Sequence, residues 1–255
     1  MIEKSYEEPS VFTPENLLRE ARRQKAIALG EVPPVCILDP DGDIVEYLAS
    51  NHRLSRCPHW ACYHTALYEF LHEGTHFGIV GCAVGAPFAV LVTEQLFTSG
   101  CKLLISVTSA GSVGERPPDT SFMLITSALR DEGTSLHYLP PGEFVSLDDH
   151  LQALLAPALT RIGVSSGASW TTDAPFRETT SAIAQARHLG LVSVEMEAAA
   201  LYAFARARQR PVVCLAHLTN TMAQQEGDFE KGDANGSLDA LHVISAVAAA
   251  VGMST

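Results

Sequence analysis

The chain has 255 residues, of which 47% are apolar and 18% charged, and its formal net charge is −12. This length and apolar content are sufficient for one large core, which predicts a single folded domain. The negative charge repels phosphate backbones and anionic lipids, so it argues against a nucleic acid or a membrane surface as the partner.

No targeting signal, membrane span or disulfide framework is recognisable. The N-terminal stretch is polar and acidic, and the longest apolar run, residues 77–92, is short and interrupted by glycines and Pro87. The six cysteines form no CxxC pair, which predicts reduced thiols. His59 and His64 flank an aromatic stretch, where a structural role is favoured over a metal site. We therefore expect a cytoplasmic protein without a metal site.

The first half of the chain alternates short strands with helices. Residues 1–30 are predicted to form an arm and a helix over 15–25, with Thr13 as the N-cap and Pro14 in the first turn. Residues 31–255 are predicted to form the main domain. Its first elements are a strand over 35–38, an acidic turn over 39–43, a helix over 44–49, a strand over 60–71, a hairpin through 73–75 and a strand over 77–80.

Two turns rich in small residues follow predicted strands. The first, residues 81–87, precedes a helix over 88–99, and the second, residues 108–112, follows a buried strand over 102–107. This order predicts parallel strands joined by a helical crossover. Sites in open α/β sheets lie beyond the C-terminal ends of such strands, so both turns are candidate site segments.

The second half continues the alternation. Together the elements predict a three-layer α/β/α fold with a mixed, largely parallel, twisted central sheet. The predicted strands cover 122–127, 164–171 and 211–218; the predicted helices cover 148–163, a short segment before 191, and 238–251; residues 130–146 and 222–235 are predicted to be irregular.

Residues 191–206 place two carboxylates, Glu195 and Glu197, in an apolar stretch. An unpaired buried charge costs several kcal/mol, so each carboxylate must be solvated, paired or neutral. One interpretation is helix-start chemistry, in which Ser193 and the two glutamates lie where a helix begins. The other is a pocket in which a carboxylate accepts hydrogen bonds from the hydroxyl groups of a ligand.

Four segments rich in small or polar residues lie just past a predicted strand, and they could line one crevice with Glu195 and Glu197. These segments are residues 81–85, 108–112, 172–176 and 219–221. The glycine-rich turn matches neither the dinucleotide nor the triphosphate fingerprint. From about residue 35 onwards, however, the chain resembles the nucleoside phosphorylase family, which is shared by uridine and purine nucleoside phosphorylases and by methylthioadenosine/adenosylhomocysteine nucleosidases. The segments that carry the resemblance are VEMEAAA at 194–200, Gly85-Ala86-Pro87, Ser109-Ala110-Gly111 and TDAPFRE at 172–178.

The resemblance implies a sugar site. Glu197 would accept hydrogen bonds from the ribose 2′- and 3′-hydroxyls, because an ionised carboxylate is acceptor-only and takes two donors at once. Met196 would pack beneath the sugar, and Glu195 would support the same wall. Ser109, with the backbone N–H of Gly85, would lie near the anomeric carbon.

The resemblance also implies a base site. Phe176 or Pro175 would stack against the base, and Arg177 would contact the base or close a lid; the alternative for Arg177 is a surface cation paired with Glu178. Asn220 follows the strand where purine-specific relatives often have an Asp. It can hydrogen-bond a base but cannot act as a general acid. The candidate catalytic residues are thus Asn220, Ser109 and Glu197.

The phosphate site departs from the family pattern. Phosphorylases of the family bind phosphate with arginines, one in a Gly-Asp-Pro-x-Arg loop and one in the strand before the small-residue turn. Here the loop, residues 38–43, is acidic, and the strand position is Ser106. A phosphate dianion beside Asp41 and Asp43 would be repelled. Without these arginines, the resemblance implies only Gly85, Ser106 and Ser109 as phosphate ligands.

The implied activity is that of a pentosyltransferase. It would cleave the N-glycosidic bond of a purine or pyrimidine nucleoside with phosphate as the acceptor, and would need no cofactor beyond this co-substrate. One alternative is hydrolysis with water as the acceptor, because the phosphate-binding arginines are missing. A second alternative is a nucleoside-binding protein without catalytic activity. Gln224-Gln225-Glu226 resembles a run in uridine phosphorylases and hints at a pyrimidine. A homo-oligomer, dimer or higher, is expected, because family members complete their sites across interfaces.

Overall fold

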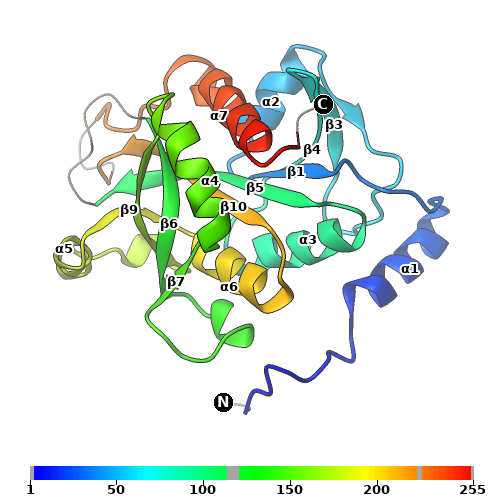
Figure 1. The fold of residues 1–255 in the computed structure, drawn as a ribbon, viewed down its shortest axis with the longest axis horizontal. Coiled ribbons are helices and arrows are strands. Elements are labelled where there is room, and N and C mark those ends of the chain that lie inside the picture. The colour runs from blue at the N-terminus through cyan, green and yellow to red at the C-terminus, as the bar shows by residue number, and fades with distance from the viewer. Residues whose placement is uncertain (1–2, 114–120, 223–225, 254–255) are drawn as a thin grey trace.

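The computed structural model describes residues 3–113, 121–222 and 226–253. In this part of the chain, ten strands form one sheet with helices on both of its faces (Figure 1). The helices are α1 (Pro14–Lys25), α2 (Asp43–Ser50), α3 (Ala86–Thr98), α4 (Asp149–Thr160), α5 (Thr180–His188), α6 (Ala198–Arg208) and α7 (Ser237–Ala250). The strands are β1 (Val35–Asp39), β2 (Ser55–Arg56), β3 (Tyr68–His72), β4 (Thr75–Gly81), β5 (Leu103–Ser112), β6 (Phe122–Asp131), β7 (Phe144–Ser146), β8 (Ser165–Thr172), β9 (Leu191–Glu195) and β10 (Val212–Asn220).

The sheet is mixed, and its longest ladders are parallel. The strand order is β10-β6-β8-β9-β5-β1-β4-β3-β2, with β7 on the outside of β6. Strand β5 also pairs with β10, so β5, β10, β6, β8 and β9 close into a ring. The two longest ladders, β5–β10 and β6–β8, are parallel, whereas β3–β4, β5–β9 and β6–β10 are antiparallel. The predicted sheet type is confirmed.

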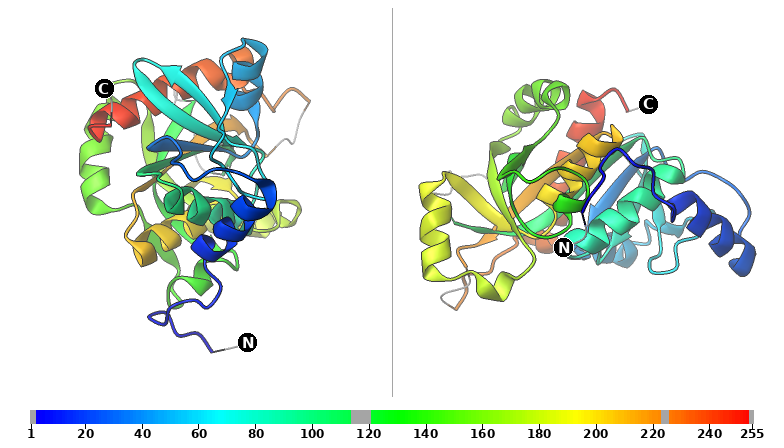
Figure 2. Two further views of the ribbon diagram at one scale, coloured as in Figure 1. Left: turned by 90° about the vertical axis from the view of Figure 1, so that its right-hand side faces the viewer. Right: turned by 90° about the horizontal axis from the view of Figure 1, so that it is seen from below.

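The helices form two layers, one on each side of the sheet. Helices α3 and α6 pack on each other, with α1 outside α3, while α7 contacts α2 and α4 on the opposite face (Figure 1). Figure 2 shows α1 and the N-terminal arm on the outside of the α3 layer. Tyr202, Phe204 and Phe77 are among the largest fully buried side chains of the core. No helix in the described ranges is both long and apolar enough to span a bilayer.

Strand β5 has a gap along one of its edges. On this edge β5 pairs with β1 over residues 103–106 and with β9 over residues 111–112, while β10 covers the opposite edge over most of its length. Between these two pairings, residues 107–110 lie where β1 and β9 have separated. Buried backbone N–H and C=O groups need partners, so those in the gap must find them outside the ladder. The chain leaves β1 and β9 at this point, so the following loops can supply them.

Two predicted elements are wrong. Residues 60–67 form a loop, and only the end of the predicted strand, Tyr68–His72, is extended and paired with β4. Trp60 is buried in that loop, and its Nε1 donates to Thr65 Oγ1 over 3.0 Å. The aromatic pattern thus reflects loop packing. Residues 108–112, predicted as a turn, continue β5, because β10 pairs with them.

Candidate functional site

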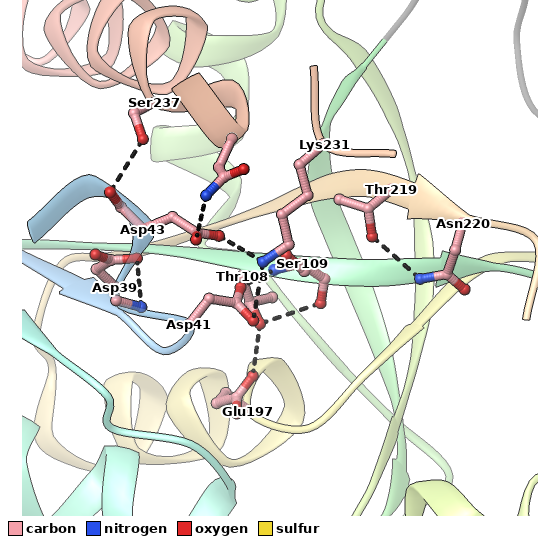
Figure 3. A network of polar contacts seen from close by, with 12 residues as sticks. Asp39, Asp41, Asp43, Thr108, Ser109, Glu197, Thr219, Asn220, Lys231 and Ser237 are labelled. Carbon is pink, nitrogen blue, oxygen red and sulfur yellow. Dashed lines mark hydrogen bonds and ion pairs between the residues drawn. The ribbon is translucent and has the colours of Figure 1, made fainter. Parts of the chain in front are cut away.

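Glu197 lies at the start of α6, with its carboxylate directed at the gap in β5 (Figure 3). Oε1 accepts a hydrogen bond from the backbone N–H of Gly85 (2.6 Å), and Oε2 accepts one from Thr108 Oγ1 (3.1 Å). The side chain is 1% exposed, and no Lys, Arg or His in the described ranges lies within ion-pair distance of it. Burial, together with the negative charge of Glu195, raises the pKa of Glu197 to about 8.

Glu195 is the last residue of β9 and fixes the start of α6. Its Oε2 accepts the backbone N–H groups of Glu197 and Ala198, each over 2.7 Å, and its Oε1 accepts the hydroxyls of Thr171 and Ser169. Burial raises the pKa of Glu195, and these hydrogen bonds oppose the rise. The helix-start interpretation therefore holds for Glu195, and the ligand interpretation of Glu197 stays a prediction. Glu195 performs the helix-start chemistry and leaves Glu197 free for another role.

Gly85 supplies the turn that brings its N–H to Glu197. It precedes α3 with φ +90°, a left-handed conformation that residues with a side chain rarely adopt. A Cβ at this position would meet no atom within 4 Å, so the requirement for glycine is one of backbone conformation, not of space.

The acidic turn after β1 closes over the gap from the other side (Figure 3). Asp41 Oδ2 accepts the backbone N–H of Ser109 over 2.8 Å. Lys231 Nζ lies 3.8 Å from Asp41 Oδ1 and is hydrogen-bonded to Asp43 Oδ2. Asn235 Nδ2 also donates to Asp43, over 3.2 Å. The position expected to hold an arginine and a phosphate is thus occupied by carboxylates and one lysine.

Asp39 shapes this turn from within. Its Oδ1 accepts the N–H of Gly42 (3.2 Å), and its Oδ2 accepts that of Val45 (2.9 Å). Burial raises the pKa of Asp39 to about 7, and the nearby charge of Asp41 contributes to the rise. Asp39 therefore holds the backbone of the loop, and Asp41 is the carboxylate that reaches Ser109.

A small cavity lies between the acidic turn and the gap. Its volume is about 20 Å³. His217 of β10 also lines it, with its ring stacked on Phe122 at 4.5 Å between ring centroids. The acidic side of the cavity is formed by Asp39, Asp41 and Asp43, and the β5 side by Val107, Thr108 and Ser109.

The structure therefore brings Gly85, Ser109, Glu195 and Glu197 together, as the sequence predicts. Met196 is half-buried beside them. Ser106 lies on β5 between β1 and β10, and its buried Oγ has no hydrogen-bond partner among the residues that the structure describes.

The candidate base-binding residues lie farther along the site or on its surface. Asn220 ends β10 opposite Gly111; its Nδ2 donates to Thr219 Oγ1 (3.1 Å), and its Oδ1 accepts the N–H of Met222 (2.9 Å). Residues 175–177 form a single 3₁₀ turn after β8, in which Pro175 is half-buried and Phe176 is 99% exposed.

Arg177 is exposed, and within the described ranges it forms no ion pair with Glu178. Neither Phe176 nor Arg177 makes a hydrogen bond or ring contact with the Glu197 group in the part of the chain that is described. Gln224 and Gln225 lie outside the described residues.

Sequence reasoning missed three members of the site. Thr108 was indistinguishable from other small residues of a presumed turn, and Lys231 lies in a polar segment without a recognisable pattern. His217 carried a usable signal, because it directly follows the apolar run 212–216 of strand β10. Throughout the described ranges, no three His, Cys, Asp or Glu side chains are arranged to hold a metal ion.

Comparison with known proteins agrees with this architecture. A uridine phosphorylase from Vibrio fischeri ES114, crystallised with 6-hydroxy-1-naphthoic acid, superposes with a TM-score of 0.70 at 18% sequence identity, covering 85% of this chain and 90% of that chain. At this identity the likeness concerns the fold. The sequence model of the phosphorylase superfamily matches residues 34–251, which include every strand and all helices except α1. The chain therefore belongs to the phosphorylase superfamily.

Proposed function

We propose that the protein cleaves the N-glycosidic bond of a nucleoside and that Glu197 binds the ribose 2′- and 3′-hydroxyls. The observation that carries the proposal is a buried carboxylate without a cationic partner in the described ranges, in a chain of the phosphorylase superfamily. A carboxylate offers about four acceptor positions, of which Gly85 and Thr108 use two. The remaining lone pairs are available to two hydroxyl donors.

The other residues of the site fit the same chemistry. As the bond between C1′ and the base nitrogen breaks, positive charge develops on the sugar. Glu197 carries a proton in the ligand-free fold below about pH 8, ionises when the ribose hydroxyls donate to it, and then stabilises this charge. Met196 packs beneath the ribose, and Ser109 lies beside the acceptor. Asn220 exchanges a local hydrogen bond for one to the departing base, and Phe176 or Pro175 stacks against the base.

Two acceptors are compatible with this bond cleavage. Phosphate is the acceptor that the resemblance to nucleoside phosphorylases implies, and it would make the protein a pentosyltransferase. Water is favoured by the surroundings of Ser109, because Asp41 already occupies its N–H group. Water also requires no cationic clamp.

A nucleoside panel tests the proposal. Purified protein is incubated with purine and pyrimidine nucleosides, in the ribose and 2′-deoxyribose series, with and without inorganic phosphate. Chromatography then measures the free base, ribose and ribose 1-phosphate. We expect base release from at least one nucleoside. Tight nucleoside binding in calorimetry without base release would instead favour the non-catalytic binding protein. The absence of both nucleoside binding and base release would overturn the proposed site.

We also propose that the protein forms a homo-oligomer. Phe176 is 99% exposed in the single chain, and on the N-terminal arm Val11 is 96% and Phe12 73% exposed. A second subunit that covered these side chains would remove apolar surface from water. Light scattering coupled to size exclusion should give a mass of at least two chains; the mass of one chain would contradict this.

A further inference from the structure

Gly85 and Ser109, two of the three residues predicted to bind phosphate, each donate their backbone N–H to a carboxylate of this chain. Gly85 donates to Glu197 Oε1 over 2.6 Å, and Ser109 donates to Asp41 Oδ2 over 2.8 Å. A backbone amide has a single N–H, so each must release its carboxylate before it can hold a phosphate oxygen well. At Ser109, Asp41 thus takes the place of an anionic acceptor (Figure 3).

The charges around Asp41 oppose a second anion. Lys231 lies 3.8 Å from Asp41 and is hydrogen-bonded to Asp43, so one ammonium group serves two carboxylates. The Lys231 side chain is 16% exposed, and in this environment opposite charges are less screened than on the surface. The cation that could have held a phosphate is therefore already neutralised.

The available volume favours a small acceptor. The cavity between Asp41, Ser109 and His217 measures about 20 Å³. By this measure a single water molecule needs about 10–15 Å³. A phosphate ion is much larger than this space between the acidic turn and β5.

We infer that Asp41 selects the acceptor: its carboxylate, held by the N–H of Ser109 and by Lys231, excludes phosphate and leaves room for water. This inference rests on the proposed nucleoside cleavage. In the resulting hydrolysis the water oxygen bonds to C1′, the C1′–N bond breaks, and its electron pair stays with the base. One proton passes, in net terms, from water to the base, so that nucleoside and water give ribose and free base.

The test compares wild-type protein with Asp41→Ala and Asp41→Asn. Calorimetric titration with sodium phosphate, at constant ionic strength set with chloride, measures phosphate binding without requiring turnover. We expect no detectable binding to the wild type. Asp41→Ala should bind phosphate at least tenfold more tightly than the wild type, because the Ser109 N–H is released and the local charge falls. Asp41→Asn, which keeps an acceptor oxygen, should bind phosphate with an affinity between those of the wild type and Asp41→Ala.

The nucleoside assay gives a second measurement. The wild type should release ribose at every phosphate concentration, whereas Asp41→Ala should give a fraction of ribose 1-phosphate that rises with phosphate concentration.

Asp149→Ala is the matched control, since it removes a carboxylate from the exposed first turn of α4 and should not change phosphate binding. Phosphate binding by the wild type, or ribose 1-phosphate as its product, would overturn the role of Asp41 while leaving the cleavage proposal intact. Failure of both Asp41 variants to gain phosphate binding would also overturn it. Base release by no variant under any condition would count against the proposed function, and the titration would still decide the role of Asp41.

Discussion

Two glutamates separated by one residue have opposite surroundings. Glu195 receives four hydrogen bonds from four different donors, so its acceptor capacity is filled within the fold. Glu197 receives two, and its partners lie 112 and 89 residues away in the sequence. The acceptor positions of Glu195 are thus filled locally, whereas Glu197 keeps unfilled acceptor positions among the described residues.

Replacing Glu197 by Gln should weaken nucleoside binding and slow cleavage together. The amide keeps the size of the side chain but loses the charge, and a hydrogen bond to a charged group contributes about 1.5–3 kcal/mol. We therefore expect kcat/KM to fall by more than about tenfold. Steady-state kinetics on the preferred nucleoside measure this. Glu143→Gln, at an exposed position, is the control; wild-type kinetics for Glu197→Gln would remove Glu197 from the site.

The raised pKa of Glu197 predicts that stability falls as pH rises. Between the ordinary value of 4.5 and the folded value of about 8, the folded protein keeps a proton that the unfolded chain has lost. The contribution is present in full below about pH 4.5 and is lost as pH rises through about 8, with a slope of at most about 1.4 kcal/mol per pH unit. Asp39, whose pKa is raised to about 7, acts in the same direction.

Urea unfolding of the wild type and of Glu197→Gln at several pH values separates the two contributions. The wild-type free energy of unfolding should decrease more steeply with pH than that of the variant, which retains the contributions of Asp39 and Glu195 but lacks that of Glu197. Equal slopes for the two proteins would show that Glu197 ionises normally in the fold.

At the scale of elements, the site depends on how α6 begins. Thr171 of β8 donates to Glu195, and its Oγ1 also accepts the N–H of Ala199 over 2.9 Å. One hydroxyl thus connects β8, β9 and the first turn of α6. The first N–H groups of a helix have no partner within the helix, so Glu195 and Thr171 together cap α6.

Thr171→Val should therefore destabilise the protein at nearly constant side-chain volume. It leaves a buried N–H of α6 without its partner, which costs about 1–3 kcal/mol. Chemical denaturation measures the loss. Thr160→Val, at an exposed hydroxyl of α4, should change the free energy of unfolding much less. An equal loss in both variants would show that the hydrogen bonds of Thr171 do not stabilise the fold more than those of an exposed hydroxyl.

The sequence predicted those elements that local patterns determine. The start of α1 at Thr13 and Pro14 and the strands β1 and β8 lie where periodicity and capping placed them. The extension of β5 through residues 108–112 was not predictable, because small residues favour a turn there and only pairing with β10 and β9 makes them a strand. Similarly, Glu197 was found from its motif, but its contacts with Gly85 and Thr108 exist only in the folded chain.

At the scale of the molecule, the ring of β5, β10, β6, β8 and β9 holds the site rigidly between two helix layers. Strand β5 runs through the centre of the sheet, and the site lies at the one stretch where two of its neighbours separate. The loops that reach this stretch come from β1, β4 and β9, so residues distant in the sequence meet there.

A nucleoside that occupies this stretch should stabilise the whole fold. A ligand that binds only the folded state, at a concentration about 100 times its Kd, raises the free energy of unfolding by about 2.7 kcal/mol. Thermal denaturation with the nucleoside panel should therefore show a raised Tm for the preferred nucleoside, and a smaller shift for Glu197→Gln. The free base and ribose added separately are the controls; an equal shift with the base alone would contradict a sugar site at Glu197.

The gap along β5 and the residues that reach into it come from different parts of the fold. The gap is created by the divergence of β1 and β9, whereas on the proposed role of Asp41 the choice of acceptor depends on the short connection between β1 and α2. That connection contributes no strand to the ring and no helix to either layer. Substitutions confined to this connection should therefore change the co-substrate and leave the strand ring and both helix layers unchanged.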